Sequence, residues 1–168
     1  MILQSERLSI RKLRLDDLEQ LHKLQSNPNV MKYITNRPKS LEETEKELNK
    51  IVTSYDENQS DFLVLAVCLT ERNEFIGTCA VIKNEERKSE VGYRLQEEHW
   101  GSGYGSELIR RLLIYCFEER NIDIVIANVE TRNHFSVKIL ENNGFELINE
   151  EFDKEIGDFV KTYQKVKK

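Results

Sequence analysis

The chain lacks the cysteine patterns of secreted and metal-binding proteins. Its 168 residues include only three cysteines, Cys68, Cys79 and Cys116, and no C-x-x-C pair. Each cysteine lies in an apolar segment. An odd number of cysteines that lie far apart in the sequence is typical of buried thiols in a reducing compartment. The segment Met1–Arg11 contains no apolar core of a signal peptide. We therefore expect a cytoplasmic protein without disulfide bonds.

Membrane spans and nucleic-acid-binding stripes are also missing from the sequence. No apolar run reaches the roughly 18 residues that a membrane-spanning helix needs. Acidic residues outnumber basic ones, 30 to 25, which gives a net charge of −5, and the only lysine-rich stretch is the short end Lys161–Lys168. Because nucleic-acid binders usually carry a basic stripe, we expect no nucleic-acid partner and no membrane partner. A mildly acidic surface tolerates cationic partners such as amines.

No linker, internal repeat or low-complexity segment divides the chain. Hydrophobic residues make up 39% and charged residues 33% of the sequence, which is the balance of a globular protein. A chain of this length buries roughly 70% of its unfolded surface, enough for a core of its own. The sequence therefore predicts a single domain over residues 1–168.

Hydrophobic periodicity and capping signals predict the elements. Asp16 with Glu19, and Ser40 with Glu43, have the spacing of capping boxes at the starts of two helices. Asn27-Pro28-Asn29 is expected to end the first of these helices, and Gly144 to cap the last one. The predicted strands are Leu8–Lys12, Phe62–Leu69, Phe75–Ile82, Ser89–Leu95, Ile122–Val129, Phe145–Phe152 and Asp158–Val166, and the remaining helices run from the glycine run to about Glu119 and over His134–Asn143.

The order of these elements favours a mixed sheet. Strands that follow one another without a helix pair antiparallel. The single strand–helix–strand unit, Ser89–Val129, is expected to be a parallel, right-handed crossover. A charged loop, Lys83–Lys88, leads into its first strand.

A glycine-rich run opens the helix of that crossover. Residues 100–106 read Trp-Gly-Ser-Gly-Tyr-Gly-Ser. Glycines permit turns that point several N–H groups inward, and a helix start adds free N–H groups and the positive end of its dipole. The run is either an ordinary tight turn or a cradle for a phosphate.

Three phosphate carriers are candidates for such a cradle. A nucleoside triphosphatase needs a lysine after the glycines, and none follows here. A dinucleotide fold needs G-x-G-x-x-G and an acidic residue after the next strand. Glu130 has that position, but the glycine spacing is wrong and only 38 residues follow it. Coenzyme A is the third candidate.

Three motifs resemble the GNAT superfamily of acyl-CoA N-acyltransferases. Gly103 and Gly105 match the end of the family loop [QR]-x-x-G-x-[GA], although Trp100 stands where Gln or Arg is usual. Trp-Gly-x-Gly-Tyr is instead the form of the branch that contains ribosomal-protein alanine and serine N-acetyltransferases. Asn133-His-Phe-Ser136 with Gly144-Phe145, and Ser89–Tyr93 before the loop, are similar to further signatures of that branch. The resemblance covers essentially the whole chain.

The resemblance implies both a fold and an activity. The fold is α+β in three layers, with a mixed, mostly antiparallel twisted sheet, one splayed parallel strand pair and helices on both faces. The activity is direct transfer of acetyl from acetyl-CoA to an amine, either a protein N-terminus or a small amine, by a monomer or a homodimer. A weakly catalytic or non-catalytic acyl-CoA-binding module is the alternative.

The resemblance also assigns the cofactor-binding residues. Backbone N–H groups of the loop bind the pyrophosphate, the strand end pairs with the pantetheine arm like an added strand, and two residues of the last helix contact the arm from the other side. Simple capping of that helix is an alternative role for Asn133 and Ser136. The assigned residues are Tyr93, Arg94, Leu95, Gly101, Ser102, Gly103, Tyr104, Gly105, Ser106, Asn133 and Ser136.

Two residues are candidates for proton transfer. Glu90 is the candidate base, because several family members place a glutamate on this strand; its alternative is a surface ion pair with Arg94. Many members use a tyrosine as acid four residues after Ser136, but that position holds Leu140 here. Ser136 is therefore the candidate acid. Tyr163 is a more distant one and is equally well a core residue.

The remaining polar residues indicate no metal site. His22, His99 and His134 lack the spacing of metal ligands. Trp100 is expected to pack beneath the loop. The acceptor pocket is expected between the two early helices, the loop Asn29–Lys39 and the final pair of strands.

Overall fold

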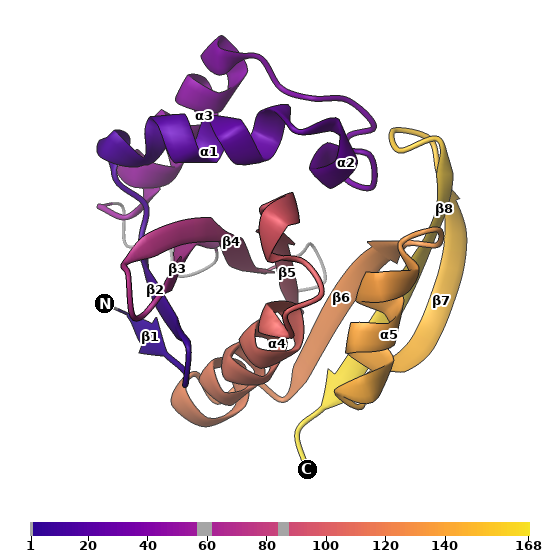
Figure 1. The fold of residues 1–168 in the computed structure, drawn as a ribbon. Helices are drawn as coiled ribbons and strands as arrows, with labels where there is room; N and C mark the ends of the chain where they lie inside the picture. Colours follow the sequence, from indigo (N-terminus) through magenta and orange to yellow (C-terminus); the bar gives the residue numbers. More distant parts are fainter. Residues whose placement is uncertain (1, 57–61, 84–87) are drawn as a thin grey trace.

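A single sheet runs through the protein (Figure 1). The computed structural model describes residues 2–56, 62–83 and 88–168, so the interior of the predicted loop 83–88 lies outside the described residues. The strands occur in the sheet order β1-β2-β3-β4-β5-β6-β8-β7. They are β1 (Leu3–Gln4), β2 (Leu8–Lys12), β3 (Phe62–Leu69), β4 (Glu74–Lys83), β5 (Ser89–Leu95), β6 (Ile124–Glu130), β7 (Glu146–Asp153) and β8 (Asp158–Val166).

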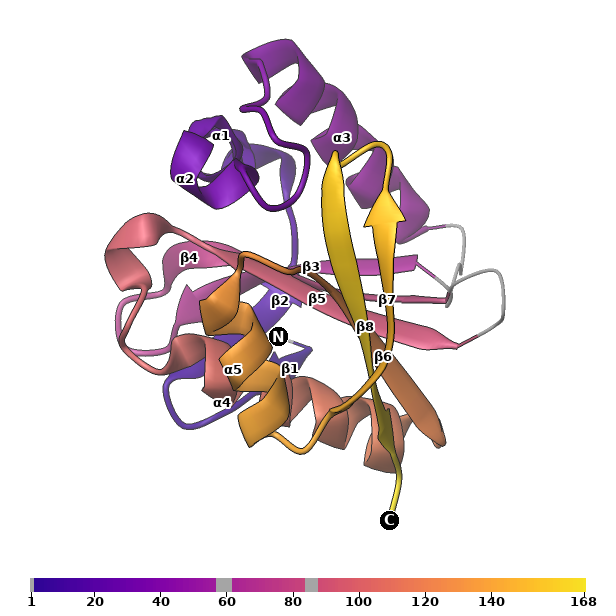
Figure 2. The same cartoon turned by 90° about the vertical axis from the view of Figure 1, so that its right-hand side faces the viewer.

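Helices cover both faces of this sheet and complete three layers (Figures 1 and 2). One face carries α1 (Leu18–Ser26), α2 (Pro28–Met31) and α3 (Leu41–Ser54). The other face carries α4 (Tyr104–Ile114) and α5 (His134–Asn142). Short 3-10 turns at Leu15–Asp17 and Glu97–His99 precede α1 and the glycine run.

Each face has its own apolar core. Leu24, Met31, Leu48 and Ile51 pack on Ala66 beneath α1–α3. The second core joins the apolar stripe of α4 to the opposite face of the sheet, and its members include Leu108, Ile109, Leu112, Val91 and Val125. β3 and β4 contribute to both cores, because successive side chains of a strand point to opposite faces. This explains the continuous apolar run Phe62–Leu69.

The predicted pairing pattern is confirmed. β5 and β6 are parallel, and every other neighbouring pair is antiparallel. The parallel pairing is short, since it joins only Ser89 to Val125 and Glu90 to Ile126. Figure 2 shows the consequence: β6 and β8 turn away from the direction of β3, β4 and β5.

One of the two predicted capping boxes is wrong. Ser40 and Glu43 do form a reciprocal box, with Ser40 N donating to Glu43 Oε2 and Glu43 N to Ser40 Oγ. Asp16 and Glu19 do not, because a 3-10 turn places Asp17 at the N-cap of α1. The Asp17 carboxylate instead accepts from Arg11 and from Arg14 N.

Other element boundaries differ for local reasons. The segment at residues 27–29 ends α1 as predicted, but it also starts α2, with Asn27 as N-cap and Pro28 as first helical residue. The two-residue strand β1 is too short to leave a periodic pattern. After Ile114 the helix predicted to reach Glu119 continues as a π-helical turn, Tyr115–Glu119. β7 is an edge strand with exposed side chains, among them Phe152.

Replacing Asp17 with asparagine is expected to lower the free energy of unfolding by about 2–3 kcal/mol at pH 7. Burial disfavours the charged carboxylate, but hydrogen bonds from Arg11 and Arg14 outweigh it and lower the pKa of Asp17. A carboxyl group whose pKa is lowered on folding stabilises the folded protein at pH values above its unfolded-state pKa of about 4. This stabilisation is lost as the pH falls through the lower, folded-state pKa. Urea titrations at pH 7 and at acidic pH are therefore expected to show a difference in the free energy of unfolding between wild type and Asp17→Asn that becomes smaller at acidic pH.

Asp16→Asn is the matched control. Asp16 is exposed, and a surface substitution of this kind changes stability by less than about 0.5 kcal/mol. Equal losses in the two variants would contradict the assignment of Asp17 as the residue that anchors this turn to β2.

Candidate active site

The site begins where β5 and β6 separate. β4 pairs with β5 along Ser89–Leu95, and β8 pairs with β6 along Ile124–Glu130. Between them the ladder stops after Glu90 and Ile126. Beyond those residues no strand of the described part of the chain pairs with the facing edges of β5 and β6, which leaves backbone groups for another extended chain to pair with.

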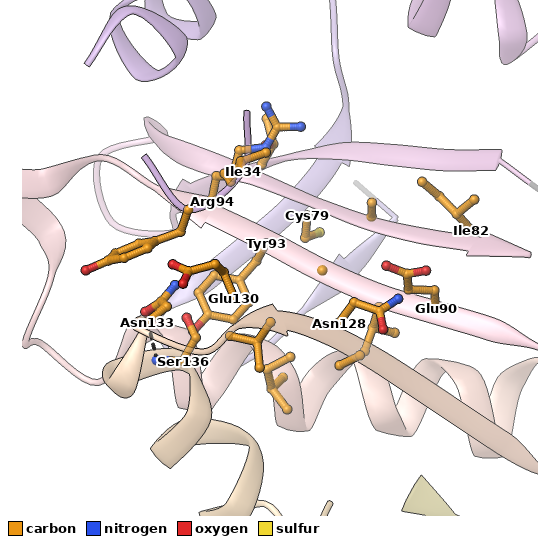
Figure 3. Close-up of a pocket in the computed structure, with 18 of the residues that line it drawn as sticks. Ile34, Cys79, Ile82, Glu90, Tyr93, Arg94, Asn128, Glu130, Asn133 and Ser136 are labelled. Atoms are coloured by element: carbon orange, nitrogen blue, oxygen red, sulfur yellow. Dashed lines mark hydrogen bonds between the residues drawn. The ribbon is translucent and has the colours of Figure 1, made fainter. Parts of the chain in front are cut away.

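A cavity of about 400 Å³ occupies this opening (Figure 3). Residues of β4, β5, β6 and α5 line it. Tyr33 and Ile34 reach it from the turn after α2, Glu47 from α3 and Ile156 from the β7–β8 turn. These are the segments in which the acceptor pocket is expected. Five predicted site residues line the cavity: Glu90, Tyr93, Arg94, Asn133 and Ser136.

A glycine on β4 fixes the position of the β5 end. A Cβ on Gly77 would lie 2.1 Å from the carbonyl oxygen of Arg94 and 2.9 Å from Leu95 Cα, so only glycine fits there. The register of β3 and β4 shifts beside it, between Val67 and Cys68, as at a β-bulge. The sequence analysis missed Gly77, since an isolated glycine in an apolar strand shows a close approach only when the partner is known.

The glycine run forms an open turn at the start of α4. Gly101 and Gly103 have φ values of +74° and +82°, and Gly103 is the N-cap. Glu107 N donates to Gly103 O, the first bond of the helix. The N–H groups of Tyr104, Gly105 and Ser106 therefore have no carbonyl within the helix to donate to. Ser106 Oγ accepts from Asn143 Nδ2 at 3.1 Å, which joins the turn to α5.

The turn between β1 and β2 supports this loop. Glu107, 9% exposed, accepts from Ser5 Oγ, Arg7 N and Arg7 Nε at 2.7–2.8 Å. Arg7 Nη1 also donates to Ser102 O, and its guanidinium lies 4.5 Å from the centre of the Tyr104 ring. The sequence analysis missed Arg7 and Glu107 because 100 positions separate them in the sequence.

Trp100 is not packed beneath the loop. Its side chain is 44% exposed, and its indole Nε1 donates to Leu95 O at 2.8 Å. The indole thus ties the loop to the end of β5 from the surface.

Asn133 and Ser136 begin α5 on the other side of the opening. Asn133 Oδ1 accepts from Ser136 N, so Asn133 caps the helix. Ser136 Oγ lies 3.4 Å from Tyr93 OH, and Figure 3 shows the Tyr93 side chain extending from β5 toward Ser136 on α5. Burial raises the pKa of Tyr93, and the hydrogen bond to Ser136 opposes that rise.

Glu90 and Asn128 face each other across β5 and β6 (Figure 3). Burial raises the pKa of the Glu90 carboxyl, against a hydrogen bond from Asn128 that lowers it. Asn128 Oδ1 accepts from Thr162 Oγ1 at 2.7 Å, which orients the amide so that its NH₂ group is the donor to Glu90. Asn128 was missed, although it is the one polar residue in the apolar run Ile124–Val129, which is a signal visible in the sequence.

The alternative prediction for Glu90, an ion pair with Arg94, is wrong. Among the described residues the charged partner of Arg94 is Glu47 on α3, at 3.8 Å from Nη2. Nη1 of Arg94 is buried without a hydrogen-bond partner there. Burial lowers the pKa of Arg94, and the nearby Glu47 carboxylate opposes that shift.

Glu130 ends β6 at the wall of the cavity. One carboxylate oxygen accepts from Arg132 N and Nε, and the other is buried without a partner among the described residues. Tyr163 lies elsewhere, fully buried, with its hydroxyl donating to Glu141. Burial, and then the Glu141 contact, raise the pKa of Tyr163 to about 12. This side chain is therefore a core residue and is not a cavity-lining acid.

The described residues contain no group of three or more potential metal ligands among His, Cys, Asp and Glu. None of the described helices is both long enough and apolar enough to span a membrane.

A family model for the acetyltransferase (GNAT) domain matches residues 7–146. The chain belongs to the GNAT acetyltransferase family. A curated relative, an uncharacterized N-acetyltransferase p20 of Bacillus licheniformis, is 31% identical and aligns over 96% of this chain and 92% of its own length. This GNAT chain is accordingly an N-acetyltransferase, and its fold class is confirmed.

Two solved structures share the GNAT fold over nearly the whole chain. Spermidine N-acetyltransferase from Vibrio cholerae, in complex with CoA and spermine, has a TM-score of 0.80 at 26% identity and covers 96% of both chains. An acetyltransferase from Salmonella typhimurium that modifies the N-terminal serine of ribosomal protein L7/L12 has a TM-score of 0.81. At 20% identity over 98% and 97% of the chains, it shows a shared fold alone. The expected likeness to the ribosomal-protein branch is confirmed at that level.

Glu107→Ala is expected to lower the free energy of unfolding by about 2–3 kcal/mol, because Ser5 Oγ and Arg7 N lose their acceptor. The Arg7 side chain is 44% exposed, so the ion pair itself adds little to this loss. Chemical denaturation measures the difference. Glu98→Ala, which removes an exposed pair with Lys23, is expected to cost less than about 1 kcal/mol; equal costs would contradict a supporting role for Glu107.

Proposed function

We propose that this GNAT chain acts as a single domain over residues 1–168 and transfers an acetyl group from acetyl-CoA directly to a primary amine. The main support for the proposal is that the pairing between β5 and β6 stops after Glu90 and Ile126. As a result, a strand edge, a cavity and two helix N-termini lie close together. The neighbour from Vibrio cholerae, solved with CoA and spermine, supports it.

The residues present fit coenzyme A. Gly101 and Gly103 keep the turn before α4 open, and of the described side chains only Arg7 lies within 4 Å of a Cβ built on Gly103. Free N–H groups of residues 102–106 at a helix start are suited to a pyrophosphate. The edge Tyr93–Leu95 is suited to an extended arm with amide groups, and Asn133 and Ser136 flank it.

When bound, acetyl-CoA supplies an activated thioester. The protein supplies orientation and proton transfer. A backbone N–H near Leu95 is the proposed donor to the carbonyl oxygen, and one such donor is worth about 3 kcal/mol in other acyl transfers. Glu90 is the proposed base, since its carboxylate faces the cavity and burial raises its pKa toward that of a useful proton acceptor.

The need for a base depends on the acceptor. An alkyl amine with a pKa of about 10.4 costs about 4.6 kcal/mol to deprotonate at pH 7, and an α-amine with a pKa of about 8 costs about 1.4. Asn128 holds Glu90 in place from β6. Ser136, within reach of Tyr93 OH, is the proposed source of a proton for the thiolate.

An acyl-CoA-binding module without turnover remains the second candidate, because Leu140 occupies the position of the usual acid. The three cysteines are free and buried, which supports the prediction of a reducing, cytoplasmic compartment. Whether the protein is a monomer or a homodimer stays a prediction.

Gly103→Ala is expected to weaken CoA binding at least tenfold in calorimetry, because φ of +82° strains a residue with a Cβ by about 1–2 kcal/mol and the added methyl group covers the loop. Gly157→Ala is the matched control. Gly157 has φ of +76° and no atom within 4 Å of an added Cβ, so it loses similar stability and keeps its CoA affinity. Unchanged CoA binding by Gly103→Ala would remove the loop from the cofactor site.

Glu90→Gln is expected to lower kcat/KM about 10²–10⁴-fold at pH 7. The kcat/KM of this variant is expected to recover as the pH approaches the pKa of the amine, because the amine then loses its proton without a base. The CoA affinity is expected to be unchanged. In the wild type, activity falls as the pH drops through the raised pKa of Glu90, because the protonated carboxyl no longer accepts a proton. Asn128→Ala removes the hydrogen bond that lowers the pKa of Glu90. In the pH profile of this variant, the loss of activity on the acidic side is therefore expected at a higher pH than in the wild type. A pH profile indifferent to both changes would contradict Glu90 as the base, whereas CoA binding without thiol release from acetyl-CoA with any amine would favour the binding module.

A further inference from the structure

The face of β5 opposite the cofactor loop carries three features in a row. Glu90, Gly92 and Arg94 alternate onto one face, whereas Tyr93 points to α4 and α5 (Figure 3). A Cβ built on Gly92 meets no atom within 4 Å. There is thus open space midway between a base and a guanidinium, which lie about 13 Å apart along the strand.

Glu47 and Glu130, which line the cavity with Arg94, each pair with another cation, although the second carboxylate oxygen of Glu130 has no partner within the described residues. Glu47 Oε2 accepts from Lys39 Nζ and from Gln25 Nε2, and Arg94 Nη2 lies 3.8 Å from Glu47 Oε1, beyond hydrogen-bond distance. Glu130 accepts from Arg132. Arg94 is therefore a cavity-lining cation with only a weak ionic contact within the described residues.

The buried Nη1 of Arg94 has no partner there, and a buried donor without a partner costs free energy. A guanidinium presents paired N–H donors that match a carboxylate. The guanidinium also disfavours a second ammonium group directly beside it, although Glu47, Glu90 and Glu130 line the same cavity. One weakly paired positive charge matches a monoanionic carboxylate better than a doubly charged phosphate.

We propose that the acceptor is a primary amine that also carries a carboxylate, with the amine in the space above Gly92 and the carboxylate on Arg94. The proposal rests on the proposed acetyl transfer. It distinguishes amino acids and acidic peptides from polyamines, and it assigns to Arg94 a specificity role that is separate from its backbone contact with the cofactor.

Matched acceptors test the proposal with the full-length protein and acetyl-CoA, by thiol release. Each pair consists of an amine with a carboxylate and a matched amine without it. The pairs are L-leucine with isoamylamine, L-lysine with cadaverine, and the amidated peptides Ala-Asp-Ala and Ala-Asn-Ala. Spermidine is tested as a polyamine acceptor for comparison. The carboxylate member of at least one pair is expected to have a kcat/KM about 10- to 100-fold higher than its partner. The amino-acid and peptide pairs distinguish the two sources of the carboxylate.

Arg94→Gln is expected to abolish that preference by raising KM for the carboxylate-bearing acceptor, while the CoA affinity measured by calorimetry stays within twofold. Arg94→Lys keeps the charge and is expected to retain part of the preference. Arg37→Gln is the control, because Arg37 pairs with Glu43 on the exposed surface and does not line the cavity.

The outcomes separate this proposal from the proposed function. Absence of CoA binding contradicts acetyl transfer itself. If CoA binds and the carboxylate-bearing compounds neither react nor bind to the CoA-loaded protein in calorimetry, the inference about Arg94 is wrong. It is also wrong if spermidine is the better substrate or if Arg94→Gln affects both members of a pair equally.

Discussion

The separation of β5 from β6 is the constraint on which the rest of the structure depends. Each strand is held along its length by an antiparallel neighbour on its outer side, and the two share only two parallel pairs. A sheet that continued this ladder would satisfy all its backbone groups internally. Ending it early leaves hydrogen-bonding groups and a cavity in the middle of the protein, where a ligand rather than solvent is expected to meet them.

The ends of the two separating strands also direct the helices. β5 leads through the glycine run to α4, and β6 leads through Thr131–Asn133 to α5, so both helix N-termini lie beside the opening. The positive ends of both helix dipoles then favour an anion at the same place. Contacts from distant segments keep this arrangement in register: Glu107 joins the glycine turn to the β1–β2 turn, and Asn143 joins it to α5.

The alternation of side chains along β5 separates two chemical tasks. Tyr93 points to α4 and α5, the side on which the glycine run lies, and Glu90 and Arg94 point to the side covered by α1–α3. In the proposed function, this strand presents its backbone edge to the cofactor and its polar side chains to the acceptor. That proposal attributes the acceptor preference to the early helices and Arg94, and cofactor binding to the glycine run and the strand edge.

The sequence by itself determined the order of the elements, the mixed sheet with one parallel crossover and the position of the glycine run, because these depend on periodicity and on turn residues close together in the chain. It also predicted Glu90, Asn133 and Ser136, which lie within motifs and line the cavity. Only the tertiary structure decided that Arg94 faces Glu47, that Asn128 holds Glu90, that Glu107 supports the loop through Arg7, and that Trp100 lies at the surface. The first three are contacts between segments far apart in the sequence, and the exposure of Trp100 likewise depends on packing. Their geometry follows from how the layers pack, and no local pattern records it.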